Sequence, residues 1–155
     1  MKSQKSKMKN QESRGFTLFE LLVIMVIIGI IATVSWSALR TLQPSWRLDG
    51  AVRDLAADLR YAQQQSVTEQ VNYGIHFSST TNEYQMIKYG TTTENVLEKS
   101  LPEGVNFYQI TGFSDEEVVF NPYGAVKEMG SVSLINIEQK IKIIEVRPSG
   151  FVKIK

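Results

Sequence analysis

The sequence contains no cysteine and only one histidine among its 155 residues. Without cysteine, thiol catalysis, cysteine-ligated zinc and a disulfide framework are excluded. The histidine, His76, alternates out of phase with the apolar residues around it, which predicts that it points to a polar face. No serine or aspartate stands at a spacing that indicates a catalytic triad with it, and the three consecutive acids at residues 115–117 are typical of a solvated loop. We therefore expect no enzymatic activity, no metal site and no cofactor.

The net charge is also small, +1, but it is unevenly distributed. Residues 1–15 carry five basic side chains and one acidic side chain, a net charge of +4. The remaining residues carry 12 basic and 15 acidic side chains, a net charge of −3. Because cations that precede an apolar run stay on the cytoplasmic side of a membrane, we expect residues 1–15 in the cytoplasm. The chain after Arg40 is then expected across the membrane.

The apolar run itself extends over residues 21–39 and contains no charged side chain. At about 1.5 Å per residue a helix of this length spans close to the ~30 Å hydrocarbon core of a bilayer. Two alternatives are a buried helix of a soluble protein and a cleaved secretory signal. The apolar residues surround the whole helix instead of forming a stripe, and the run exceeds the usual signal-peptide core. We therefore predict a single transmembrane helix over residues 16–45.

The periodicity changes twice after this segment. Leu48, Val52, Leu55, Leu59 and Ala62 recur every three or four residues, which predicts an amphipathic helix over residues 46–70. Pro44, between the two helical stretches, is expected to kink or locally break the rod.

From residue 71 to residue 155 the period is two, with turn signals between short runs. About seven strands are expected, near residues 71–77, 84–88, 105–107, 118–120, 132–137, 140–146 and 151–154. The sequence therefore predicts an α+β fold, in which a long N-terminal helix packs its leucine stripe on an antiparallel β-sheet domain.

The most informative segment lies where the basic leader meets the apolar run. Glu20 stands at the entry of the apolar helix, where a carboxylate is costly and usually has a partner. If the chain is cut after Gly15, Phe16 gains a free α-amino group four residues before Glu20. That amine and the carboxylate can neutralise each other, within one subunit or between neighbouring subunits. Gly15 suits a cleavage site, because a residue without Cβ enters a narrow peptidase cleft.

The series Gly15-Phe16-Thr17-Leu18-Phe19-Glu20, followed by about twenty apolar residues, resembles the class III signal of type IV pilins and type II secretion pseudopilins. The resemblance implies that a prepilin peptidase of the inner membrane cuts after Gly15 and methylates the Phe16 amine. It implies that Glu20 pairs with a neighbour's N-terminus during filament assembly. Residues 1–15 would be the leader and the C-terminal domain periplasmic. The implied partners are the peptidase, other pilins or pseudopilins, the inner-membrane assembly platform and membrane lipid.

A second resemblance concerns the rest of the chain. Residues 54–63 are similar to the helix of minor subunits of the GspH/FimT family, and residues 120–124 and 148–153 are similar to that family's strand turns. Two functions remain open: a structural minor subunit of a secretion pseudopilus or type IV pilus, and a minor pilin that binds DNA for uptake. Some FimT-like pilins bind DNA through a C-terminal Gly-Arg-x-Arg stretch. Here the first arginine is replaced by Phe151, which leaves Lys153 and Lys155 as the candidate DNA-binding residues.

Overall fold

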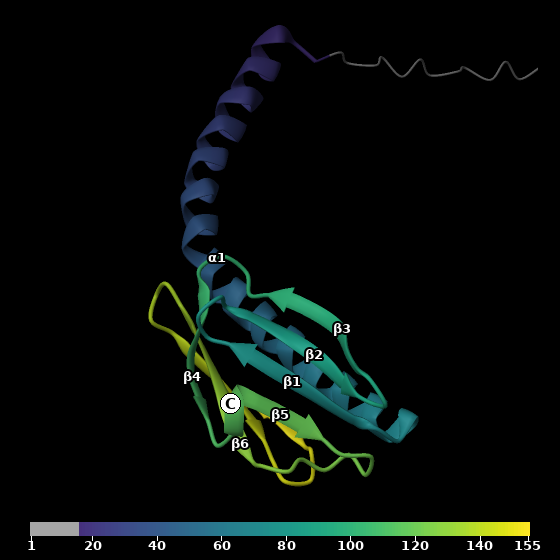
Figure 1. Ribbon diagram of the computed structural model, residues 1–155. Coiled ribbons are helices and arrows are strands. Elements are labelled where there is room, and N and C mark those ends of the chain that lie inside the picture. The colour runs from purple at the N-terminus through teal and green to yellow at the C-terminus, as the bar shows by residue number, and fades with distance from the viewer. Residues whose placement is uncertain (1–15) are drawn as a thin grey trace, which may run out of the picture. The chain divides into compact units, whose positions relative to one another are not determined.

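The computed structural model describes residues 16–155, except for the side chains of residue 34 and residues 36–41 (Figure 1). A single helix, α1 (Leu18–Glu69), leads into eight strands. The chain divides into two compact units, with the boundary between Leu39 and Arg40. Of the two effects expected at Pro44, a kink or a local break, the break is absent, because Pro44 lies inside the continuous helix α1. A proline removes one helical hydrogen bond, and the following turns are held in place by their buried leucine stripe.

The strands form two antiparallel sheets of four. The first has the order β3-β2-β1-β5, and the second has the order β4-β6-β7-β8. The strands are β1 (Asn72–Ser78), β2 (Glu83–Tyr89), β3 (Thr93–Ser100), β4 (Val105–Thr111), β5 (Glu117–Phe120), β6 (Gly130–Asn136), β7 (Ile141–Val146) and β8 (Val152–Ile154). These elements confirm the predicted α+β fold with a long helix on antiparallel sheets. Strand β3 was not predicted, because it lies exposed at a sheet edge and its polar sequence lacks alternation.

The core lies between the domain half of α1 and the two sheets. All five residues of the predicted stripe, from Leu48 to Ala62, are at most 2% exposed. They meet the inward side chains of both sheets, among them Phe77 and Met86 from the first and Leu134 and Ile144 from the second. Figure 1 shows β1, β2 and β3 running side by side across this half of the helix. Burial of this apolar surface is the main term that holds helix and sheets together.

Polar contacts fix the position of α1 on the first sheet. The Tyr84 hydroxyl donates to Oδ2 of Asp58 at 2.6 Å, and the Lys99 ammonium approaches the same oxygen at 2.7 Å. At its last residue, Glu69, the helix is paired again, with Lys88. These contacts set both the height and the rotation of α1 on the sheet.

Three tyrosines of the first sheet are expected to resist ionisation. Burial, and then the Asp58 carboxylate, raise the pKa of Tyr84, and burial with Glu117 raises the pKa of Tyr89 to about 12. Burial and Glu69 also raise the pKa of Tyr73. Because these pKa values are higher in the folded chain, their contribution to stability is complete below about pH 10 and is lost as the pH rises beyond it.

Absorbance at 295 nm during an alkaline titration checks this expectation. Part of the phenolate signal should appear only together with loss of tertiary structure. Tyr84→Phe should remove part of that late signal. If all six tyrosines ionised near pH 10 in a folded chain, the raised pKa values would be contradicted.

Two loops meet α1 at Gln63. The Gln63 side chain donates from Nε2 to the carbonyl of Gly124 at 2.7 Å and reaches the carbonyl of Ser149 at 3.4 Å. Gly150, which follows, has a φ of +78° that favours glycine, and an added Cβ would overlap the Gly124 carbonyl and the Gln63 amide. The turns at residues 120–124 and 148–150, singled out in the sequence, are thus joined on one helix residue.

Candidate assembly site at the start of the helix

The described chain begins with Phe16, whose side chain is 72% exposed. Thr17 precedes the first helical residue, and its Oγ1 accepts a hydrogen bond from the backbone N–H of Glu20 at 3.2 Å. This is the geometry of a helix N-cap, and it satisfies one of the free N–H groups of the first turn. Thr17 was not predicted as a cap, although the spacing Thr-x-x-Glu is the signal of a capping box.

Glu20 lies in the first turn of α1 and is exposed. A carboxylate there is favoured by the positive end of the helix dipole. Within residues 16–155, its side chain forms no ion pair with another described residue. The predicted processing site, Gly15, lies outside the described residues. The structure therefore shows a carboxylate next to Phe16 that is available to a partner.

The next four turns of α1 expose apolar side chains in every direction. Thirteen large apolar side chains between Phe16 and Ile31 are 39–83% exposed. The polar exceptions are satisfied within the helix: Thr33 Oγ1 donates to the Ile30 carbonyl at 2.7 Å, and Ser35 Oγ donates to the Ile31 carbonyl at 2.9 Å. Such back-bonded hydroxyls leave no free donor on the helix surface. This surface needs cover, either from lipid or from other helices.

Among the residues described with their side chains, no helical stretch is both long and apolar enough to cross a membrane. The predicted span, residues 21–39, includes residues 34 and 36–39, whose side chains lie outside those described.

Of the two candidate DNA-binding residues, Lys153 is exposed on β8 and Lys155 is exposed directly after it. Lys155 forms an ion pair with Glu145 at 2.7 Å, and Lys153 stands opposite Glu145 in the register of β7 and β8. Lys155 lowers the pKa of Glu145, so the acid is ionised at neutral pH. Arg147 also approaches Glu145, at 3.8 Å. The basic groups here therefore surround a carboxylate.

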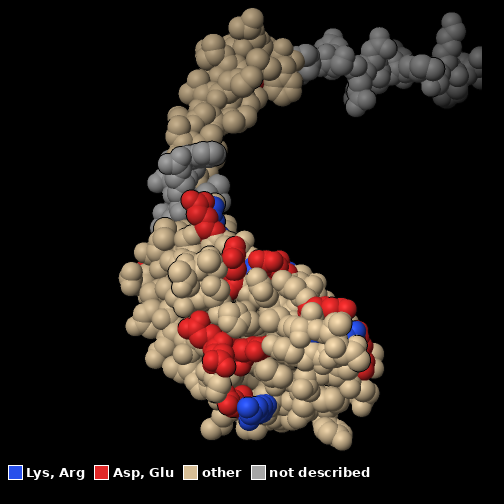
Figure 2. All heavy atoms as spheres, viewed as in Figure 1, with Lys and Arg blue, Asp and Glu red and all other residues tan. Residues whose placement is uncertain are grey.

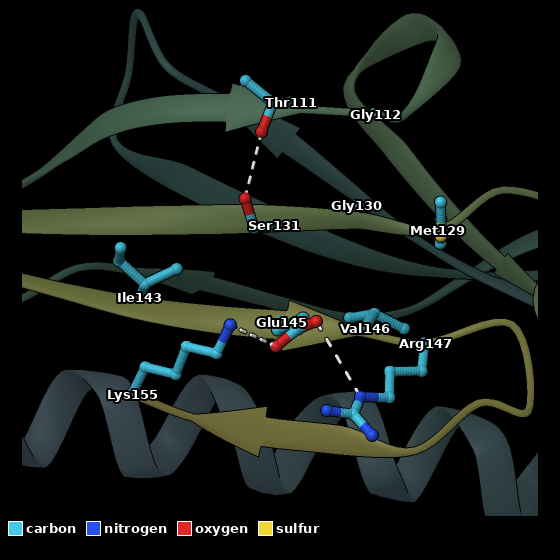
Figure 3. A pocket seen from close by; sticks show the side chains of 10 residues that line it. All are labelled: Thr111, Gly112, Met129, Gly130, Ser131, Ile143, Glu145, Val146, Arg147 and Lys155. Atoms are coloured by element: carbon cyan, nitrogen blue, oxygen red, sulfur yellow. Dashed lines mark hydrogen bonds and ion pairs between the residues drawn. The ribbon is translucent and has the colours of Figure 1, made fainter.

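Lys155, Glu145 and Arg147 line a groove of about 460 Å³ on the second sheet, and Figure 3 shows how they lie in it. Lys155 and Arg147 point toward Glu145 from opposite sides, while Ile143 and Met129 supply apolar walls. Thr111 and Ser131 share a hydrogen bond at 3.0 Å between β4 and β6. The groove presents mixed charge, not a run of free cations.

Acidic side chains spread over the opposite sheet (Figure 2). On this face the Tyr89 hydroxyl donates to Glu117 at 2.6 Å, and the bridge crosses β1 above Gly74. Gly74 leaves room for this bridge, because an added Cβ would displace the Glu117 carboxylate. His76 lies on the same strand, half-exposed beside buried Ile75 and Phe77, as its phase predicted. No group of three metal-ligating side chains is found in the part of the chain that the structure describes.

Two protein-family models match this chain. The model of the prokaryotic N-terminal methylation motif matches residues 10–36, and the model of type II transport protein GspH matches residues 51–150. A search of curated protein sequences finds no significant match.

Solved structures share the fold at low sequence identity. The minor pseudopilin EpsH from the type 2 secretion system of Vibrio cholerae superposes with a TM-score of 0.60 at 9% identity, over 70% of this chain and 96% of EpsH. The type IV minor pilin FimU of Pseudomonas aeruginosa superposes with a TM-score of 0.57 at 12% identity, over 70% of this chain and 87% of FimU. Because the GspH model covers most of the chain behind a methylation motif, this protein belongs to the GspH family of type II transport proteins.

Proposed function

We propose that the protein is a minor pseudopilin or pilin, a structural subunit of a type II secretion pseudopilus or a type IV pilus. The observation that carries this proposal is the exposed apolar half of α1, which begins with Phe16 and a free Glu20 and leads into a GspH domain. An apolar helix of this kind fits two environments, a bilayer before assembly and a bundle of like helices afterwards.

The start of α1 supports a specific assembly contact. After cleavage behind Gly15, the Phe16 amine is a cation next to a helix that enters an apolar environment. Glu20 of a neighbouring subunit offers the matching anion, and its own backbone N–H is already satisfied by Thr17. Because charges in such surroundings are costly unless paired, the contact sets the register of one subunit against the next.

The remaining features complete the proposal. Residues 1–15 form the cytoplasmic leader, residues 16–45 contain the single span of the inner membrane, and the domain lies in the periplasm. The prepilin peptidase removes the leader and methylates Phe16. Other pilins or pseudopilins and the inner-membrane platform then take the subunit into the filament.

Gly15→Leu is expected to abolish processing, because a branched side chain replaces the only residue without Cβ at the cut. The measurement is the intact mass and N-terminal sequence of the protein isolated from its native membrane. The unaltered chain should begin at Phe16 with one added methyl group, and the variant should begin at Met1. Gly90→Leu, in an exposed turn, is the matched control and should be processed normally. A mature mass in the Gly15→Leu variant would refute the assignment.

DNA uptake is the alternative that we do not favour. Phosphate binding needs clustered, available cations. Lys155 and Arg147 are instead turned toward Glu145, and Lys142 is paired with Asp49 at 3.3 Å. This arrangement is more typical of a solvated sheet surface, in which Lys153 and Lys155 protect an edge strand from pairing with other chains.

A further inference from the structure

The end of the globular domain at which α1 enters exposes three apolar side chains. Leu42 and Trp46 on α1 are 48% and 58% exposed, and Ile137, in the turn between β6 and β7, is 68% exposed. We call these three residues the collar. Single exposed apolar residues are common, but these three gather around α1 where the chain leaves the apolar segment.

Two loops are joined to α1 at the level of the collar: the turn between β6 and β7, through Ser45, and the loop before β4, through Arg47. Ser45 Oγ accepts a hydrogen bond from Lys140 Nζ at 2.8 Å and donates to Oε2 of Glu138 at 3.2 Å. Arg47 donates from Nη1 to the Glu103 carbonyl at 3.0 Å. Ile137 therefore lies at the same height along α1 as residues 45–47.

The turn itself holds Ile137 outward. The side-chain oxygen of Asn136, a residue only 3% exposed, accepts the backbone N–H groups of Glu138 at 3.0 Å and Lys140 at 2.9 Å. Below it, Gly104 has a φ of +83°, and an added Cβ would lie 3.3 Å from Cγ2 of Ile137. An apolar side chain is thus kept exposed by a rigid turn.

Among the side chains that the structure describes, the charged groups near the collar form pairs of opposite sign. Arg47 faces Glu103 at 3.6 Å, and Lys140 faces Glu138 at 2.9 Å. Asp49 and Lys142, on the next turn of α1 and on β7, pair with each other as well. Because no net charge remains among these groups, attraction to an oppositely charged partner does not explain the surface.

The position along the chain indicates the occupant. Leu42 and Trp46 follow Leu39, the last residue of the uncharged apolar run, by three and seven residues, or roughly 5 and 10 Å along a helix. The headgroup layer on each side of the hydrocarbon core is on the order of 5–7 Å thick. Leu42 falls within this layer. Trp46 starts just beyond it, but helical side chains lean toward the N-terminus, which directs both side chains back toward the apolar run. Tryptophan is enriched at the interface between membrane and water.

We propose that the collar is a lipid-contacting surface, through which the domain of the unassembled subunit rests on the headgroup layer of the membrane. The inference relies on the proposed membrane anchoring, from which it is separable by experiment. The contact is apolar and works with zwitterionic lipid. It holds the domain at a fixed height before the subunit enters a filament.

The test uses the full chain, reconstituted at one subunit per nanodisc in phosphatidylcholine. Because the sequence has no cysteine, Ile137→Cys carries a polarity-sensitive dye at a single site. Trp36→Phe leaves Trp46 as the sole tryptophan, and brominated phosphatidylcholine reports its depth. We expect a blue shift of the dye at residue 137 and loss of Trp46 emission with brominated lipid.

Two further cysteine variants, labelled with the same dye, distinguish failure of the collar proposal from failure of the proposed membrane anchoring. Tyr123→Cys lies in the turn held by Gln63, about 25 Å further along α1, and its side chain is 91% exposed, so it should report water. Ile30→Cys lies in the apolar segment and should report lipid. If residue 30 is in lipid and residue 137 reports water, as residue 123 does, the collar proposal is overturned while the anchor stands. If residue 30 also reports water, the proposed function fails.

Two further results would overturn the proposal. A shift at residue 137 that appears only with several subunits per disc would assign the collar to another protein copy. A shift that requires anionic phosphatidylglycerol would assign the contact to charge. The apolar contact is supported if the dye at residue 137 already shows the full blue shift with one subunit per disc in phosphatidylcholine.

Discussion

Glu20→Ala is expected to insert into the membrane and lose its leader normally, yet to co-assemble far less than the unaltered chain. The substitution removes the anion and leaves the neighbour's Phe16 amine unpaired in an apolar environment. Breaking a buried pair from one side costs about 3–5 kcal/mol, which corresponds to a loss of incorporation on the order of a hundredfold or more.

The measurement is the ratio of variant to unaltered subunit in purified filaments, with both expressed in the same cells and quantified by mass spectrometry. Asp54→Ala is the matched control, because it removes an exposed carboxylate from the domain half of α1. Glu20→Asp retains the charge and should recover part of the incorporation. Equal incorporation of Glu20→Ala and the unaltered subunit would contradict the pairing of Glu20 with the Phe16 amine.

Gly150→Ala should destabilise the globular domain by about 3 kcal/mol. Alanine at a φ of +78° is strained, and its Cβ would displace the Gln63 amide from the Gly124 carbonyl. The loss combines left-handed backbone strain with a broken, part-buried hydrogen bond. For a domain of this size we expect the melting temperature to fall by roughly 10 °C.

Thermal unfolding followed by circular dichroism in detergent checks this result. Gly90→Ala is the matched control, because its added Cβ would lie 3.6 Å from the nearest atom, the Thr92 carbonyl oxygen, in ordinary contact. Its melting temperature should stay close to that of the unaltered chain. A Gly150→Ala domain as stable as this control would show that the turn relaxes without cost.

The leucine stripe of α1 was predictable because a buried helix face imposes its period on the sequence. Most strands of the sheets followed for the same reason, since one face of each is buried. Strand β3 escaped prediction because almost every residue in it is exposed, and backbone pairing with β2 alone keeps it in the sheet. A buried face requires apolar residues at a regular period, and an exposed edge strand such as β3 has no such requirement.

The contacts of the candidate site also differ in whether the sequence could predict them. The segment from Gly15 to Glu20 was recognisable because its chemistry is local in the sequence. The convergence on Gln63 was not, because the contacts to Gly124 and Ser149 join residues 61 and 86 positions apart. Likewise, the pairing of Lys155 with Glu145 depends on the register of β8 against β7. Single residues show their type in the sequence, but long-range partners appear only in the fold.

The fastening of α1 to its domain has a mechanical consequence. Polar contacts hold the helix at separate heights, at Asp49, Asp58, Gln63 and Glu69. A pull along the helix axis loads all of these contacts together, in shear, whereas a sideways pull would open them one after another. When a subunit is drawn out of a bilayer by its helix, the load follows the axis. These contacts are thus arranged so that the domain half of α1 and the sheets resist an axial pull together.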